Sequence, residues 1–179
     1  MPEGLLNILK PPGMTSHDIV DAVRKILGMR RVGHTGTLDP AAAGVMVLMV
    51  GATTRLSRFL TARPKVYRAE ITFGIATDTL DGEGEIVAEA DASHLDVSTL
   101  RRALEELTGT IEIAPPMYSA VWHQGRRLYD LARRGATVQV ATRSSVVERF
   151  ELLDFQPGAV ARALTEVACS SGTYVRSLA

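Results

Sequence analysis

Apolar positions in the first third of the chain follow the spacing of a strand and then that of a helix. The apolar run Leu5–Leu9 predicts a first strand. From Ile19 to Leu27 the apolar residues recur every three or four positions, which predicts a helix that ends at the next glycine. We expect Thr15 or Ser16 to be the N-cap of this helix, with Asp18 completing a capping box.

Strand and helix patterns mix without strict alternation in the rest of the chain. The expected strands are Val45–Val50, Val66–Phe73, Glu85–Ala88, Ile111–Ile113, Ala120–His123, Val146–Phe155 and Leu164–Cys169. The expected helices lie near Thr54–Leu60, between a Ser98 cap and Gly109, and at Arg126–Arg134. Because a turn at residues 81–84 precedes Glu85–Ala88, we expect a hairpin between that strand and Val66–Phe73. This mixture predicts an α+β fold, with a mixed, mainly antiparallel sheet and flanking helices.

Composition is typical of one soluble domain. The chain has 179 residues, of which 46% are hydrophobic, so it can bury a proper core. Its single cysteine, Cys169, excludes an internal disulfide and fits a reducing compartment. The longest apolar run, Val45–Val50, is too short to cross a bilayer, and no basic-then-apolar leader opens the sequence. We therefore expect a cytoplasmic protein.

Charge is zero overall but is segregated along the chain. Residues 1–68 hold ten lysines and arginines against four carboxylates, and residues 69–115 hold two against eleven. Residues 116–179 hold eight against five. Phosphate attraction depends on local positive surface, so the total does not exclude a nucleic-acid partner. Mutual neutralisation of the acidic and basic segments across the fold is the equally weighted alternative.

The run Arg30–Pro40 concentrates two arginines, two glycines, a histidine and an aspartate directly before an apolar strand. Glycines permit positive φ or close approach of a ligand, and Pro40 fixes the exit from the loop. The pattern predicts a tight loop that presents His34 and Asp39 beside a buried strand. By itself it marks a candidate site, since Asp-Pro is also common in ordinary turns.

The same run resembles the G-H-x-G-x-L-D-P motif of the TruB-type tRNA pseudouridine-55 synthases. Further blocks occur in the order of that family: Leu9–Ser16, Lys65–Tyr67, Thr77–Gly84, Pro115–Ala120, Gly125–Arg133 and Cys169–Arg176. Each block is weak alone, but together they extend over almost the whole chain. The resemblance implies the pseudouridine synthase fold and an isomerase that converts uridine 55 in the TΨC arm of tRNA to pseudouridine. It implies no metal or other cofactor, because the reaction has no redox change.

The resemblance also implies roles for individual residues. Asp39 matches the catalytic aspartate, and Arg176 is its expected partner, since a bidentate guanidinium keeps a buried carboxylate ionised. Tyr67 and Tyr174 are expected in the uracil pocket, and His34 is expected to fill the space that the flipped uridine leaves. The expected phosphate contacts are Lys10, Arg30, Arg31 and Lys65. We interpret four arginines of the expected basic helix as a solvent-exposed face: Arg126, Arg127, Arg133 and Arg134.

The sequence departs from the family pattern at two points. Trp122 stands where the family usually has a lysine. The chain ends at Ala179, a few residues into the helix expected after Arg176, whereas family members continue. We therefore expect residues 1–179 to be a partial catalytic domain without the C-terminal RNA-binding domain, with weak or no turnover and marginal stability.

Two other functions remain open at this stage. A non-catalytic tRNA-binding or tRNA-folding protein would keep the fold without turnover. A guide-RNA-dependent relative would act within a ribonucleoprotein, although the short N-terminal start and the lack of basic tails favour a stand-alone monomer without an obligate protein partner. A small-molecule phosphate enzyme has only the glycine loop in its favour, and we set it aside.

Overall fold

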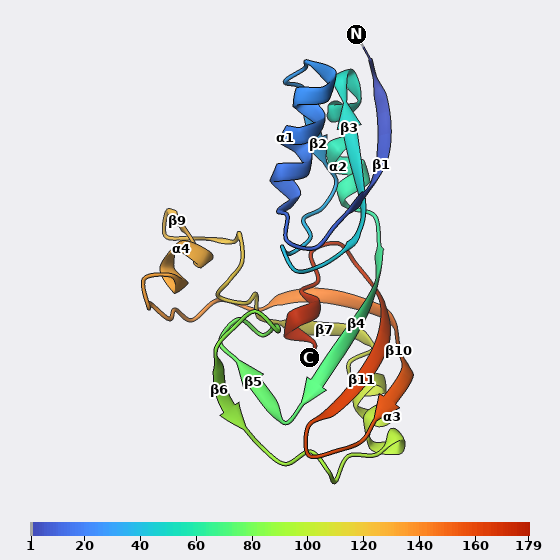
Figure 1. The fold of residues 1–179 in the computed structure, drawn as a ribbon, viewed down its shortest axis with the longest axis vertical. Coiled ribbons are helices and arrows are strands. Elements are labelled where there is room, and N and C mark those ends of the chain that lie inside the picture. The colour runs from blue at the N-terminus through green and yellow to red at the C-terminus, as the bar shows by residue number, and fades with distance from the viewer. Residues whose placement is uncertain (1) are drawn as a thin grey trace. The chain divides into compact units, whose positions relative to one another are not determined.

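The computed structural model describes residues 2–179 and divides the chain into two compact units (Figure 1). The N-terminal unit ends at Arg63, and the C-terminal unit begins at Pro64. Each unit has its own buried apolar cluster. The two are described separately below.

The N-terminal unit is a three-stranded antiparallel sheet with a helix packed on it. The strands are β1 (Gly4–Lys10), β2 (Val32–His34) and β3 (Gly44–Val50), in the order β1-β3-β2. Helix α1 (Ser16–Leu27) contributes one side of the core, and the sheet contributes the other. The buried members of this core are Ile19, Val20, Val23, Val32, Met46 and Leu48.

Local signals define α1 as the sequence predicts. Thr15 is the N-cap, its hydroxyl accepts from the Asp18 amide, and the Asp18 carboxylate accepts from the Thr15 amide at 2.8 Å. Gly28 ends the helix in the left-handed conformation, with φ of 60°. Ile26 shares the apolar spacing but is 80% exposed, so the apolar stripe is wider than the face that packs. The helix predicted near Thr54–Leu60 is a 3₁₀ helix, η1 (Gly51–Leu56), followed by α2 (Ser57–Thr61).

The C-terminal unit contains a four-stranded antiparallel sheet in the order β4-β11-β10-β7. Its strands are β4 (Lys65–Phe73), β7 (Gly109–Ile113), β10 (Arg143–Gln156) and β11 (Ala161–Cys169), and α3 (Val97–Glu106) packs against β10. The buried core contains Ile71, Leu104, Ile113, Val147, Phe150, Val167, Cys169 and Leu178. The short 3₁₀ helix η2 (Val175–Ser177) follows the sheet in sequence.

Two predicted details of this unit are wrong. Strand β6 (Ile86–Glu89) pairs with β5 (Ile75–Thr77), whereas β4 pairs with β11. Gly74 separates β4 from β5 at a φ of 91°, where a Cβ would lie 2.7 Å from the Ala90 carbonyl oxygen. The N-cap of α3 is Asp96, whose carboxylate accepts from the Thr99 amide at 2.7 Å, and not Ser98.

The predicted basic helix is shorter than expected. Only Leu128–Ala132 is helical (α4), because Arg126–Arg127 forms β9 and pairs with β8 (Trp122–His123). Gln124 and Gly125 both have positive φ and close this small hairpin. The α+β class with antiparallel sheets and flanking helices is nevertheless confirmed. Within residues 2–179, no helix has the length and apolar character needed to span a membrane.

Candidate functional site

The loop that carries Asp39 is anchored on both sides of that residue. On the preceding side, the Ser16 hydroxyl accepts from the Leu38 amide at 2.8 Å and donates to the Leu38 carbonyl at 3.1 Å. On the following side, the Pro40 carbonyl accepts from the Gly13 amide at 2.9 Å. The K-P-P-G-M-T-S block therefore serves as the scaffold of the L-D-P turn, although it lies about 25 residues earlier in the sequence.

Lys10 completes this scaffold from the end of β1. Its ammonium group is fully buried and donates to the carbonyls of Pro11, Met14 and Pro40, at 3.0, 2.7 and 3.0 Å. An ammonium has three donors, so every one of them is used. Lys10 thus leaves no exposed surface for the predicted phosphate contact, and that prediction is wrong. The residue joins two loops instead.

These contacts hold the backbone of Asp39 in one geometry. The Asp39 carbonyl accepts from the Ala42 amide at 3.1 Å, and its neighbours on either side are tied to Ser16 and Lys10. The side chain is partly buried. The Asp39 side chain therefore starts from a constrained point of the backbone.

His34 lies at the end of β2, opposite Leu48 of β3, and is partly buried. Burial lowers its pKa below the ordinary value of 6.5, and a hydrogen bond with the Gly36 backbone opposes this shift. Within residues 2–179, its Nδ1 atom is buried without a hydrogen-bond partner. The imidazole is therefore neutral at physiological pH. A neutral, flat ring is compatible with the predicted space-filling role, which stays a prediction.

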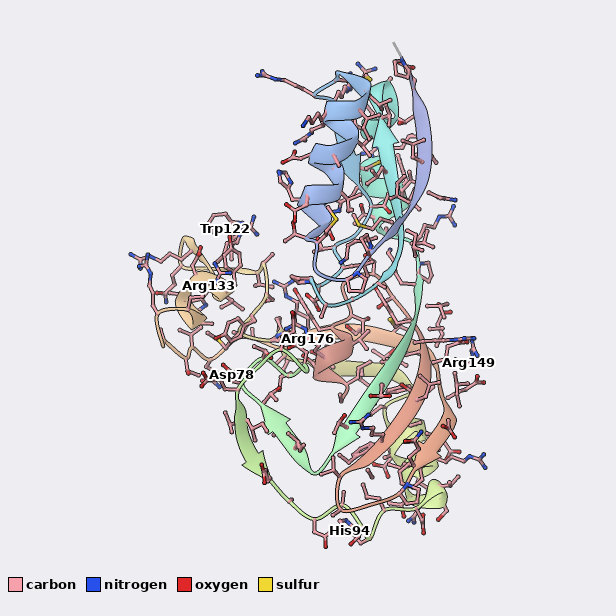
Figure 2. All side chains as sticks on the ribbon, in the orientation of Figure 1. Asp78, His94, Trp122, Arg133, Arg149 and Arg176 are labelled. Atoms are coloured by element: carbon pink, nitrogen blue, oxygen red, sulfur yellow. The ribbon has the colours of Figure 1, made fainter. Side chains whose placement is uncertain are left out.

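The Arg176 side chain contacts three groups within its own, C-terminal unit. Its guanidinium donates to the Thr79 carbonyl at 3.0 Å and to the Tyr118 carbonyl at 2.9 Å, and it lies 3.4 Å from the Asp81 carboxylate. Both members of the Arg176–Asp81 pair are largely buried, at 15% and 23% side-chain exposure. Figure 2 shows Arg176 on η2, with Asp78 on the neighbouring loop. The expected pairing of Arg176 with Asp39 stays a prediction.

Sequence reasoning missed Asp81 as a partner of Arg176. The sequence predicts only a turn at residues 81–84 in this block, whereas the loop is tied together by its own side chains. The Asp81 carboxylate accepts from the Thr79 hydroxyl at 2.6 Å and from the Glu83 amide at 3.0 Å. The sequence signal for an ion pair here is the occurrence of two aspartates within residues 77–81. Two carboxylates so close together are stabilised by a nearby cation.

Asp78 links the same loop to the Pro115–Ala120 block. Its carboxylate accepts from the Glu85 amide at 2.9 Å and from the Tyr118 hydroxyl at 3.4 Å. Burial raises the pKa of Tyr118, and the Asp78 carboxylate raises it further. Tyr118 therefore stays protonated and can donate to Asp78 while its carbonyl accepts from Arg176.

The predicted tyrosines lie at the edge of the C-terminal core. Tyr67 is opposite Val167 in the β4–β11 pair, and Tyr174 immediately precedes η2. Both are partly buried and pack against the core cluster. The cluster thus brings Tyr67, Tyr174 and the η2 segment that carries Arg176 into one region, while His34 and Asp39 belong to the other unit.

The remaining predicted phosphate contacts differ from Lys10 in exposure. Arg30 and Arg31 are exposed, and the Arg31 Nε donates to the Thr54 hydroxyl at 2.9 Å. Lys65 is partly buried at the start of β4, opposite Cys169. Across residues 2–179 there is no group of three or more histidine, cysteine, aspartate or glutamate side chains that could hold a metal ion.

Curated relatives match nearly the whole chain. The tRNA pseudouridine synthase B of Symbiobacterium thermophilum is 56% identical over 177 residues, which are 99% of this chain and 59% of that protein. The enzyme of the same name from Gloeobacter violaceus is 50% identical and is covered to 61%. The chain therefore spans about three fifths of the length of the curated relatives that it matches.

Solved structures share the fold. A Cbf5-Nop10-Gar1 complex contains a chain that matches with a TM-score of 0.70 and 27% identity, over 98% of this chain and 42% of that chain. An H/ACA RNP bound to a substrate RNA matches with a TM-score of 0.65 and 26% identity, and 40% of that chain is covered. The model of the N-terminal domain of TruB family pseudouridylate synthases matches residues 24–175. This chain therefore belongs to the TruB family of pseudouridylate synthases.

Proposed function

We propose that this chain carries the catalytic part of a tRNA pseudouridine synthase that isomerises uridine 55 in the TΨC arm. One observation supports this most strongly: a relative named tRNA pseudouridine synthase B is 56% identical over 99% of the chain. At this identity the motif residues are expected to keep their roles. We further propose that the protein is a cytoplasmic monomer that binds the TΨC stem-loop and needs no metal or other cofactor.

The reaction breaks the bond between N1 of uracil and C1′ of ribose and forms a bond between C5 and C1′. The proton on C5 leaves, and N1 gains a proton, so atoms balance without an oxidant or a leaving group. We assign the reacting carboxylate to Asp39, which adds to the sugar–base unit or removes a sugar proton. The anchoring of Leu38 and Pro40 supports this role, because a reacting group must stay within a fraction of an ångström of its position.

Arg176, Tyr67 and Tyr174 are the proposed residues that receive the base and balance the charge of Asp39. The guanidinium stays ionised at any working pH, and its position is fixed by Asp81 and two carbonyls. The two tyrosines offer flat faces at the margin of the core. His34 is proposed to fill the gap left by the flipped uridine, and Arg30, Arg31 and Lys65 to contact phosphates.

Tritium release tests the proposal directly, because only formation of the C5–C1′ bond frees the hydrogen on C5. A tRNA transcript labelled with tritium at uridine C5 is incubated with the chain and with Asp39→Asn, which is nearly identical in shape. Release by the native chain alone supports the assignment. Tight tRNA binding without release by the native chain would favour a non-catalytic tRNA-binding role for residues 1–179.

A guide-dependent activity is the second candidate, and the structural likeness to the Cbf5-Nop10-Gar1 complex favours it specifically. The relatives of higher identity are the tRNA enzymes, so we rank it second. Release from bare tRNA, with no guide RNA or protein added, would exclude it. Release only after a guide ribonucleoprotein is supplied would support it.

A further inference from the structure

Residues 118–142 form an arm between β7 and β10 that contains β8, β9 and α4. In Figure 1 this arm extends away from the β4-β11-β10-β7 sheet of the same unit. Its fixed point is Leu128, which is fully buried and whose amide donates to the Val121 carbonyl at 2.9 Å. The Tyr129 amide donates to the Ser119 carbonyl at 3.1 Å. The arm thus has a defined backbone around a small apolar centre.

The arm exposes Trp122, the only tryptophan in the chain, which is 61% accessible to solvent. Arg127 is its partner across the β8–β9 pair, and the guanidinium carbon lies 4.2 Å from the centre of the indole ring. Arg127 also donates to the Ala120 carbonyl, which holds the guanidinium in place. One face of the indole is therefore covered by a cation, while the residue as a whole stays largely exposed. Figure 2 shows Trp122 on the arm.

The surroundings of Trp122 are positively charged. The arm contains four arginines, Arg126, Arg127, Arg133 and Arg134, against one carboxylate, that of Asp130. A second aromatic–arginine pair lies nearby in sequence, with Arg133 5.7 Å from the centre of the Tyr129 ring. An exposed aromatic face beside several cations suits a partner that has both flat rings and negative charge. Unpaired RNA has both, whereas a duplex conceals the faces of its bases.

Trp122 differs from the family pattern in a way that changes the contact. A lysine at this position would contact a phosphate as a point charge, and its contribution would weaken with added salt. An indole binds a base through its face, and that contribution depends little on salt. Pairing of this arm with the same arm of a second copy is disfavoured, because it would bring two arginine-rich surfaces together.

We propose that Trp122, backed by Arg127, is a stacking site for an unpaired nucleobase of an RNA bound along the arm. This inference rests on the proposed function only in that the partner is RNA. It requires neither turnover nor a particular target uridine. The base stacks on the indole face, and the neighbouring arginines contact the flanking phosphates.

The single tryptophan makes the test direct, because all indole fluorescence comes from the proposed site. The intact chain is titrated with a single-stranded oligouridylate, and both Trp122 emission and the anisotropy of labelled RNA are followed. Quenching that tracks binding is expected, since a stacked base quenches an indole. A duplex RNA of equal length should bind with little quenching.

Three variants separate stacking from charge. Trp122→Ala should weaken oligouridylate binding by about 5-fold to 150-fold, the range that one aromatic–base stack supplies. Trp122→Phe, which keeps a ring, should retain most of the affinity. Trp122→Lys should recover affinity at low salt and steepen the logarithmic salt dependence by about 0.7, the value for one added phosphate contact on a single strand.

Phe59→Ala is the matched control, because Phe59 is another exposed aromatic residue with an arginine over its ring, at 4.5 Å from Arg58. It should leave oligouridylate affinity unchanged. The stacking proposal is overturned if RNA binds without changing Trp122 emission, if Trp122→Ala binds as tightly as the native chain, or if no RNA binds. Quenching without tritium release would support the stacking site and count only against turnover by residues 1–179, and release without quenching would refute the stacking site alone.

Discussion

The Asp39 loop and the Trp122 arm both lie outside the two larger sheets, yet they are held by opposite means. Buried polar groups hold the loop: the Lys10 ammonium and the Ser16 hydroxyl are almost inaccessible, and each binds backbone carbonyls of distant residues. A buried leucine holds the arm, which leaves its aromatic and basic side chains in solvent. Directional bonds in a dry site allow one geometry, because an unmade bond there is costly. Apolar contact allows small shifts, which suits a surface that follows a flexible RNA.

Lys10→Met tests the polar anchor of the Asp39 loop. Of the substitutions considered, it should have the largest effect on stability and on tritium release. Methionine keeps similar volume but leaves the carbonyls of Pro11, Met14 and Pro40 without their shared donor. We expect a loss of about 3 kcal/mol or more in the free energy of unfolding. Tritium release should fall by about 100-fold, because a misplacement near 1 Å has that effect. Denaturant unfolding and the release assay measure the two.

Lys25→Met is the control for this substitution, because Lys25 is exposed in the last turn of α1. It should change the free energy of unfolding by less than about 1 kcal/mol. Equal losses at the two positions would show that the buried ammonium has no special role.

The next test compares Ser16→Ala with Thr15→Ala, because the two residues are adjacent but make different hydrogen bonds. Ser16→Ala removes both bonds to Leu38 and should lower the free energy of unfolding by about 1–3 kcal/mol. Thr15→Ala removes the helix N-cap and should cost about 1 kcal/mol. Only Ser16→Ala is expected to reduce tritium release at a temperature where both variants are folded. A comparable decrease for Thr15→Ala would mean that overall stability, and not loop position, controls turnover.

The same distinction between local and distant contacts explains what the sequence could predict. Helix α1 is predictable because its cap, capping box and terminal glycine lie within a few residues of its ends. The pairing of β4 is not, because its partner β11 is about 95 residues away, and the nearby turn at 81–84 offered a plausible local partner. At α3 the predicted cap, Ser98, lies inside the helix, because the backbone places Asp96 at the N-cap, where its carboxylate accepts from the Thr99 amide.

Site residues follow the same rule. The motif spacing located the Asp39 loop, but a cation in a motif gives no information on its burial, so Lys10 was assigned to phosphate when it binds carbonyls. The Arg176–Asp81 pair joins residues that are 95 positions apart, and nothing local in either block indicates it. Long-range packing therefore decides which partner each of these side chains contacts, and spacing along the chain does not show it.

Gly84→Ala tests whether close packing in the loop at residues 77–84 fixes the position of Arg176, as buried hydrogen bonds fix the Asp39 loop. A Cβ at residue 84 would meet the side chains of Asp78 and Thr79 and would lie 2.9 Å from the Thr79 amide nitrogen. The loop must shift, and the Thr79 carbonyl that binds Arg176 would shift with it. We expect a destabilisation of about 1–3 kcal/mol and a loss of tritium release.

Gly82→Ala is the matched control in the same turn, because a Cβ there has nothing within 4 Å. It should be tolerated in both assays. Loss of release in both variants would show that the turn needs glycine flexibility throughout. Loss in neither would show that the position of Arg176 does not depend on this loop.

The smallest expected effect concerns His34, whose Nδ1 atom is buried without a hydrogen-bond partner among residues 2–179. Its folded-state pKa is lowered by burial, whereas the unfolded chain takes up a proton near pH 6.5. Above that pH both states are neutral, so His34 contributes no pH dependence. As pH falls below 6.5, the unfolded state binds a proton that the folded state does not, and the free energy of unfolding decreases.

Denaturant unfolding at pH 7.5 and pH 5.5 measures this decrease. The carboxyl groups with lowered pKa, including Asp96 at about 2 and Glu166, change charge mainly below this window and contribute little to the difference. His34→Gln should therefore reduce the difference between the two pH values, while His94→Gln, at an exposed position, should leave it unchanged. If His34→Gln keeps the full difference, the imidazole is solvated in the folded protein, and burial does not lower its pKa.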